Sequence, residues 1–131
     1  MGRDHLMLLD TCALLWLANN HKNISRDVLS RIEDAPSIYI SAITCFEIAL
    51  KCKSGKLTLP IPVKSWLDLV LEHHDISVIE MDRDIALLSV DLPPHHKDPC
   101  DRFIIATAMI HNLSVITADE NFKIYGIKVL I

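Results

Sequence analysis

Four carboxylates stand at comparable places along the chain, each where an apolar segment ends or in the first turns of the helix predicted after it. These residues are Asp10, Glu47, Asp101 and Asp119. In a parallel α/β fold the carboxyl ends of the strands share one edge of the sheet, so we expect the four side chains to converge there. Converging carboxylates repel one another, and hard divalent cations relieve that repulsion. The pattern therefore predicts a metal site for Mg²⁺ or Mn²⁺, which suit oxygen ligands.

A metal site of this kind suits the hydrolysis of a phosphodiester. A bound divalent ion lowers the pKa of a coordinated water and stabilises the leaving oxygen, and two ions can divide these tasks. Each acid also has a simpler interpretation, because a negative charge near a helix start is favoured by the helix dipole. Asp10 fits that interpretation least, since apolar residues lie on both sides of it and a buried lone carboxylate needs a partner or a metal.

Short apolar runs alternate with amphipathic stretches along the chain. The runs predict five strands, at His5–Leu9, Ser37–Ile40, Ile76–Glu80, Leu113–Ile116 and Ile127–Ile131. The stretches between them predict helices at Thr11–Asn19, Ser25–Glu33, Ser41–Lys53 and Val63–His73, then one through Ile85 to Ser89 and one from Asp98 to Asn112. This alternation predicts a single domain over residues 1–131 with a three-layer α/β/α fold, in which a parallel sheet has the order 3-2-1-4-5.

Helix-start residues mark three of these boundaries. Ser41 is a predicted N-cap whose helix ends at Gly55, and Asp98 is a predicted cap followed by a proline that suits the first helical position. Thr117 and Glu120 have the spacing of a capping box. That arrangement would leave the carboxylate of Asp119 free to face the metal site.

Composition bounds the class of protein. The 131 residues are half apolar and carry a net charge of -4, which gives no overall attraction to nucleic acid. The apolar stretch Leu6–Ala18 is interrupted by an acid and too short to cross a bilayer, and the first ten residues lack a secretory signal pattern, so we expect a cytoplasmic protein with no membrane partner. The four cysteines show no C-x-x-C pair and are predicted to be small buried hydrophobes.

Charged neighbours of the acids have two interpretations each. Asp98 is an auxiliary acid or a helix cap, and Arg102 pairs with a nearby acid or contacts substrate phosphate. Lys51, four residues after Glu47, forms an ion pair with it or contacts phosphate. The adjacent histidines His73-His74 and His95-His96 are predicted to lie on the surface, because neighbouring residues do not share a face. Both tryptophans, Trp16 and Trp66, are expected in the core.

Four segments together carry a family resemblance that spans nearly the whole chain. LLDTCALLWL (8–17), SAITCFEIALK (41–51), DPCDRFIIATA (98–108) and VITADENF (115–122) resemble the PIN-domain ribonucleases, specifically the VapC type of bacterial toxin–antitoxin modules. The resemblance implies a PIN-like fold whose metal-binding acids fall on Asp10, Glu47, Asp101 and Asp119, with Thr11 and Thr117 as hydroxyl supports. Cys45 and Cys100 depart from the residues commoner at their positions, and neither replaces a ligand.

The resemblance also implies an activity and partners. The implied activity is Mg²⁺- or Mn²⁺-dependent cleavage of single-stranded RNA by a metal-activated water, leaving 5′-phosphate and 3′-hydroxyl ends. The implied partners are a second copy of the chain, in a homodimer, and a cognate antitoxin that blocks the acids with a basic side chain.

Three other functions remain open on the sequence. The first is an RNA-binding PIN domain without catalysis. The second is a receiver-type signalling domain in which Asp82 imitates a phospho-acceptor, although the paired acids expected after the first strand are missing. The third is a phosphatase using Asp10 as nucleophile, which should carry an acid where Cys12 stands.

Overall fold

A five-stranded parallel sheet with the order β3-β2-β1-β4-β5 forms the centre of the computed structural model, which describes residues 6–19 and 21–130. The strands are β1 (Leu6–Leu9), β2 (Ser37–Ser41), β3 (Ile76–Ile79), β4 (Ser114–Ile116) and β5 (Val129–Leu130). The predicted topology is confirmed. The predicted strand ends at His5 and Ile131 lie outside the described residues.

Eight helical segments connect the strands in the described part of the chain. They are α1 (Thr11–Asn19), η2 (His21–Asn23), α2 (Arg26–Asp34), α3 (Ala42–Lys53), α4 (Val63–His73), α5 (Arg83–Asp91), α6 (Pro99–His111) and η3 (Glu120–Tyr125), where η denotes a 3-10 helix. The six α-helices correspond to the predicted ones. The two 3-10 segments were not predicted from the sequence.

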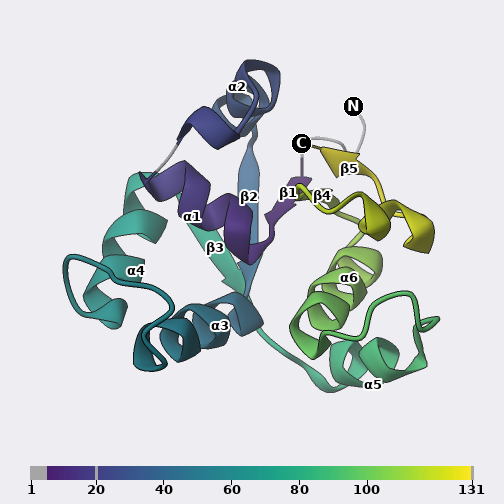
Figure 1. The fold of residues 1–131 in the computed structure, drawn as a ribbon. Helices are drawn as coiled ribbons and strands as arrows, with labels where there is room; N and C mark the ends of the chain where they lie inside the picture. The colour runs from purple at the N-terminus through teal and green to yellow at the C-terminus, as the bar shows by residue number, and fades with distance from the viewer. Residues whose placement is uncertain (1–5, 20, 131) are drawn as a thin grey trace.

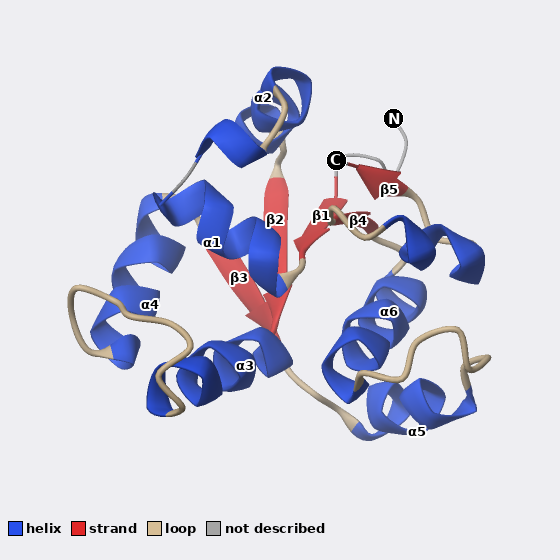
Figure 2. Ribbon diagram, viewed as in Figure 1, coloured by secondary structure: helices blue, strands red, loops and turns tan. Residues whose placement is uncertain are grey.

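The helices form two layers on opposite faces of the sheet. Figure 1 shows α1, α2, α3 and α4 on one side and α5, α6 and η3 on the other, and Figure 2 shows the strands as a thin layer between them. Alternate residues of β1 belong to the two cores: Met7 and Leu9 pack with the first group of helices and Leu8 packs with the second. Period-two alternation with both faces apolar explains why the strand reads as a continuous hydrophobic run.

Side-chain caps define where the helices begin. The Ser41 hydroxyl accepts the Ile43 N–H at 3.1 Å, and Asp98 accepts the Cys100 N–H at 2.9 Å, which confirms both predicted caps. Gly55 follows α3 with a φ of 80°, a backbone conformation that favours glycine at a helix end.

The predicted capping box at Thr117 and Glu120 is wrong. Asp119 caps η3 instead, because its Oδ1 accepts the Asn121 N–H at 2.9 Å, while the Thr117 hydroxyl accepts the Asp119 N–H at 3.0 Å. Since Oδ1 of Asp119 is engaged in the cap, Oδ2 is the oxygen that faces the site.

The prediction of buried cysteines is also wrong. Cys12 is exposed, and Cys45, Cys52 and Cys100 are partly exposed. On α1, the neighbours Thr11 and Ala13 are buried, whereas Cys12 between them lies at the wall of an open cleft. Within residues 6–19 and 21–130, no helix has the length and apolar character needed to cross a membrane.

Candidate metal centre

Asp10 lies at the topological switch point of the sheet. It follows β1 directly, and its backbone N–H donates to the Ile116 carbonyl at the end of β4 at 3.1 Å. The side chain is buried, with Oδ1 accepting the Ala13 N–H at 2.8 Å at the start of α1. Strand order reverses between β1 and β4, and ligands of open α/β sheets bind in the crevice at such a point.

Glu47 is held toward the same edge by a threonine at the start of α1. The Thr11 hydroxyl donates to Glu47 Oε1 at 2.6 Å and lies 3.2 Å from the Thr44 hydroxyl. The other oxygen, Oε2, lies 3.8 Å from Lys51 Nζ, so the structure contains the predicted ion pair along α3. Thr11, the residue after Asp10, therefore links the start of α1 to Glu47 of α3.

Thr117 connects two of the acids. Its hydroxyl bonds the carboxylate of Asp10 and accepts the backbone N–H of Asp119. Burial raises the pKa of Asp10, and the negative charges of Glu47 and Asp119 raise it further, while the hydrogen bonds from Thr117 and Ala13 oppose that rise. A positive charge placed beside this carboxylate would offset the rise in its pKa.

Asp101 shows the mutual repulsion of the acids most clearly. Burial is the main cause that raises its pKa to about 7, and the charges of Asp98, Glu47, Asp10 and Asp119 add to the rise. The other three predicted acids therefore all raise the pKa of Asp101 through their charges. Carboxylates that disfavour one another's ionisation form a donor set that fits a divalent cation and does not fit an anion.

An open cleft of about 330 Å³ gives access to the acids. Its lining includes Asp10, Asp101 and Asp119, with Thr117, Ala118, Cys12 and Trp16 around them. Trp66 is buried as predicted, whereas Trp16 is only partly buried and forms part of this wall. A polar ligand can therefore reach the acids from solvent beside an aromatic side chain.

Among residues 6–19 and 21–130, the guanidinium of Arg102 pairs with no acid, and the expected pairing with Asp98 or Asp101 is wrong. Its donors instead bond five backbone carbonyls at 2.7 to 3.2 Å, those of Ser89, Val90, Leu92, Pro93 and His96. Arginine suits this role because its five N–H donors are arranged in a rigid plane. Arg102 therefore holds the end of α5 and the loop before α6, and the structure offers no support for a phosphate contact by this side chain.

His96 is the site residue that sequence reasoning missed. Its side chain is 11% exposed, with Nε2 at 3.4 Å from Asp119 Oδ2 and Nδ1 at 3.9 Å from Asp101 Oδ2. The predicted surface position is therefore wrong for His96, although His73 and His95 are exposed as expected. No signal in the sequence separates His96 from its neighbour His95, since both lie in the same short segment before the helix that carries Asp101.

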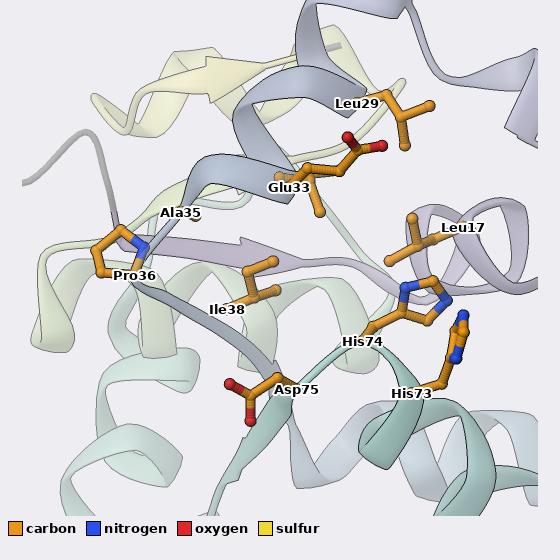
Figure 3. Close-up of a pocket in the computed structure, with 10 residues that line it drawn as sticks. Leu17, Leu29, Glu33, Ala35, Pro36, Ile38, His73, His74 and Asp75 are labelled. Carbon is orange, nitrogen blue, oxygen red and sulfur yellow. The ribbon is translucent and has the colours of Figure 1, made fainter.

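A second pocket, of about 300 Å³, lies at the opposite edge of the sheet. Figure 3 shows its lining, which includes Ile38 near the start of β2, Asp75 just before β3, and the adjacent rings of His73 and His74. Within the described residues, the one group of metal-ligating side chains that come close enough to share an ion is His96, Asp101 and Asp119. This group, which could hold a metal ion, includes Asp101 and Asp119, two of the acids that line the cleft.

The geometry is inconsistent with a receiver domain. Asp82 follows β3, which is an edge strand, whereas the phospho-acceptor of the receiver hypothesis would follow a central strand. Its carboxylate caps α5 by accepting the Ile85 N–H at 2.8 Å. Asp82 therefore serves as the N-cap of α5, and it does not line the cleft that holds the acids.

Comparisons with known proteins agree with the fold and identify the family. The family model described as the PIN domain matches residues 7–128. Ribonuclease VapC22 of Mycobacterium tuberculosis (strain ATCC 25618 / H37Rv) is 31% identical over 118 residues, which cover 89% of each chain.

Solved structures give the same result at the level of the fold. VapBC2 from Rickettsia felis, bound to a promoter DNA fragment, aligns with a TM-score of 0.71 and 19% identity over 95% of this chain and 96% of that chain. A toxin–antitoxin complex from Klebsiella pneumoniae aligns with a TM-score of 0.65 and 25% identity over the same shares. Because the family model and the VapC22 alignment each span most of the sequence, the chain belongs to the PIN-domain family and, within it, to the VapC-type ribonucleases.

Proposed function

We propose that this chain is a metal-dependent endoribonuclease that cleaves single-stranded RNA and acts as the toxin of a toxin–antitoxin pair. The observation that carries the proposal is the arrangement of four acids from distant parts of the sequence. Asp10, Asp101 and Asp119 line one cleft, and burial together with the charges of nearby acids, Glu47 among them, raises the pKa of Asp101 to about 7. Such a cluster is costly for the fold, and it becomes favourable once a divalent ion is bound.

In this proposal the metal ligands are Asp10, Glu47, Asp101 and Asp119, and the ion is Mg²⁺ or Mn²⁺. When bound, the ion supplies a water of lowered pKa and positive charge for the phosphate. Thr11 orients Glu47 and Thr117 orients Asp10 through the hydrogen bonds described above.

Lys51 is proposed to contact the RNA backbone. Its side chain is 35% exposed, and its contact with Glu47 at 3.8 Å is long enough to be shared with a phosphate. Asp98 caps α6 and strengthens the negative field at Asp101 without being a proposed ligand. Single-stranded RNA is the proposed substrate because its backbone and unstacked bases can enter an open cleft, whereas the narrow major groove of double-stranded RNA hides its base edges.

A protein partner is supported by large apolar side chains left on the surface. Phe46 and Leu50 of α3 are 55% and 52% exposed, and Leu87 and Val90 of α5 are 61% and 77% exposed. Exposed apolar side chains gathered on helices are typical of surfaces that bind another protein. We assign these surfaces to a homodimer contact and to a cognate antitoxin, since the chain shares its fold with proteins solved as VapBC and toxin–antitoxin complexes. The proposed location is the cytoplasm, where RNA substrate is present.

The test is cleavage of a labelled single-stranded RNA by the purified full chain. We expect cleavage with Mg²⁺ or Mn²⁺, none with EDTA, and 5′-phosphate and 3′-hydroxyl ends on the products. Asp10→Asn should abolish cleavage, whereas the charge-matched control Asp68→Asn, on the exposed surface of α4, should cleave normally. Cleavage that survives EDTA or Asp10→Asn, above a mock-purified sample, would contradict the proposal.

The same experiment distinguishes the proposed enzyme from an RNA-binding PIN domain without catalysis. That alternative predicts RNA binding, measured by fluorescence anisotropy, with no cleavage under any metal condition. Three acids lining the cleft, with the charge of Glu47 acting on one of them, favour the enzyme.

A further inference from the structure

Hydrogen bonds with side chains hold the backbone of His96 on both sides. Its backbone N–H donates to the Tyr125 hydroxyl at 2.8 Å, and its carbonyl accepts from Arg102 at 2.9 Å. The Tyr125 hydroxyl in turn donates to the Pro93 carbonyl at 2.9 Å. Both backbone groups of His96 are therefore held by side chains from other elements.

The imidazole ring is also held, by two aromatic rings of η3. It stacks on Tyr125 with a centroid separation of 6.1 Å and meets Phe122 edge to face at 5.2 Å. Phe122 is fully buried and Tyr125 is nearly so. The ring therefore has little freedom to turn its nitrogens away from Asp101 and Asp119.

Nε2 of this ring is a buried polar atom whose hydrogen-bonding capacity is unused. Among the described residues it has no hydrogen-bond partner, although Asp119 Oδ2 lies 3.4 Å away. Buried polar atoms without a partner are costly and uncommon in native proteins, and an ion is one of the explanations for them. Because the ring is held in this orientation, the unpaired nitrogen is a constant feature of the site.

The separation of Nε2 and the carboxylate suits two ligands of one ion. Ligands about 2.1 Å from a metal and 90–110° apart lie roughly 3.0–3.4 Å from each other. The nitrogen, Asp119 and Asp101 each offer a ligand atom, and these atoms lie within 4.8 Å of one another. Histidine and carboxylate together form a mixed nitrogen and oxygen site, which favours transition-metal ions over Mg²⁺.

We propose that His96 is a nitrogen ligand of the metal centre and that, with Asp119 and Asp101, it makes the site bind Mn²⁺ in preference to Mg²⁺. This inference rests on the proposed function, since it places His96 beside the acids that hold the divalent ion. It adds a ligand outside the four carboxylates, and it gives the loop before α6 a role in choosing the ion.

The matched variants are His96→Phe and His95→Phe. The first removes both nitrogens and keeps a ring between Phe122 and Tyr125, and the second makes the same change at the exposed neighbour. Thermal unfolding of the metal-free proteins establishes that both variants are folded. Pulsed EPR of the Mn²⁺-loaded full chain then reports whether an imidazole nitrogen is bonded directly to the ion.

We expect directly bound nitrogen in the wild-type protein and in His95→Phe, and none in His96→Phe. In competition titrations, His96→Phe should lower the ratio of Mn²⁺ to Mg²⁺ affinity by about 10-fold or more. Mn²⁺ bound tightly by the wild-type protein with no nitrogen signal would overturn the role of His96 and leave the four-carboxylate site standing. If the wild-type protein bound no Mn²⁺, both this inference and the proposed function would fail.

Discussion

Replacing Asp101 by asparagine should stabilise the metal-free protein near neutral pH and destabilise the metal-bound protein relative to wild type. The pKa of the Asp101 carboxylate is about 7 in the folded protein, against 3.8 for an unperturbed aspartate. Between these values the unfolded chain has released the proton while the folded chain retains it, so the metal-free fold loses stability as pH rises toward 7. Asp101→Asn removes this charge. In the absence of metal, the stability of the variant relative to wild type should therefore be greater at pH 8 than at pH 4.

The size of the effect follows from the pKa difference. At 1.36 kcal/mol for each tenfold change in proton affinity, the upper bound is about 4 kcal/mol. The side chain is 28% exposed, so solvent screening reduces this to about 2 kcal/mol. In a domain of 131 residues, 1 kcal/mol shifts Tm by about 3–5 °C. The difference in Tm between Asp101→Asn and wild type should therefore increase by roughly 6–10 °C from pH 4 to pH 8.

Metal should reverse the order of stability. An ion at 100 times its Kd stabilises the wild-type protein by about 2.7 kcal/mol, and a variant that has lost a ligand gains much less. The assay is thermal unfolding of wild type, Asp101→Asn and the exposed control Asp68→Asn at both pH values, with EDTA or Mn²⁺. The reasoning is refuted if Asp101→Asn and Asp68→Asn show the same pH dependence in EDTA, or if Mn²⁺ raises Tm equally in all three proteins.

Further substitutions test other parts of the site. Arg102→Met should lower the free energy of unfolding by about 3 kcal/mol or more, because five backbone carbonyls lose a charged donor, and urea titration should show no rescue by Arg102→Lys. Thr11→Val removes the buried hydroxyl bonded to Glu47, so calorimetry should show metal affinity about 10- to 100-fold weaker, and the lost hydrogen bonds should lower the free energy of unfolding by about 1–3 kcal/mol; unchanged metal affinity would remove Thr11 from the site. Lys51→Met should weaken RNA binding at low salt and reduce the salt slope by about 1 if the lysine contacts a phosphate, and an unaltered slope would leave Lys51 as the partner of Glu47 alone.

The sheet order and the convergence of the acids could be predicted because they follow from local patterns. Apolar runs with buried periodicity fixed the strands, and the rule that parallel strands share one carboxyl edge placed Asp10 and Asp119 together. The same rule placed Glu47 and Asp101 near them, since each lies early in a helix that follows a strand or a cap.

The features that could not be predicted depend on contacts between distant segments. Arg102 reaches carbonyls 6 to 13 residues earlier in the chain, and these bonds give the loop its shape and direct His96 inward. Nothing in the sequence distinguishes His96 from its exposed neighbour His95 before that loop is in place. The capping of η3 by Asp119 was missed for a related reason, because Thr117 is engaged by Asp10 and the backbone of Asp119 and is not available to cap the helix.

A crystal structure of the protein grown with Mn²⁺, with anomalous diffraction used to locate the metal, tests the central claim most directly. We predict an anomalous peak in the cleft, within about 2.5 Å of carboxylate oxygens from Asp10 and Asp101, with Glu47 and Asp119 contacting the same ion, a second ion or their waters. Peaks found elsewhere on the protein, with the four carboxylates bonded only to protein atoms and water at saturating Mn²⁺, would contradict the account.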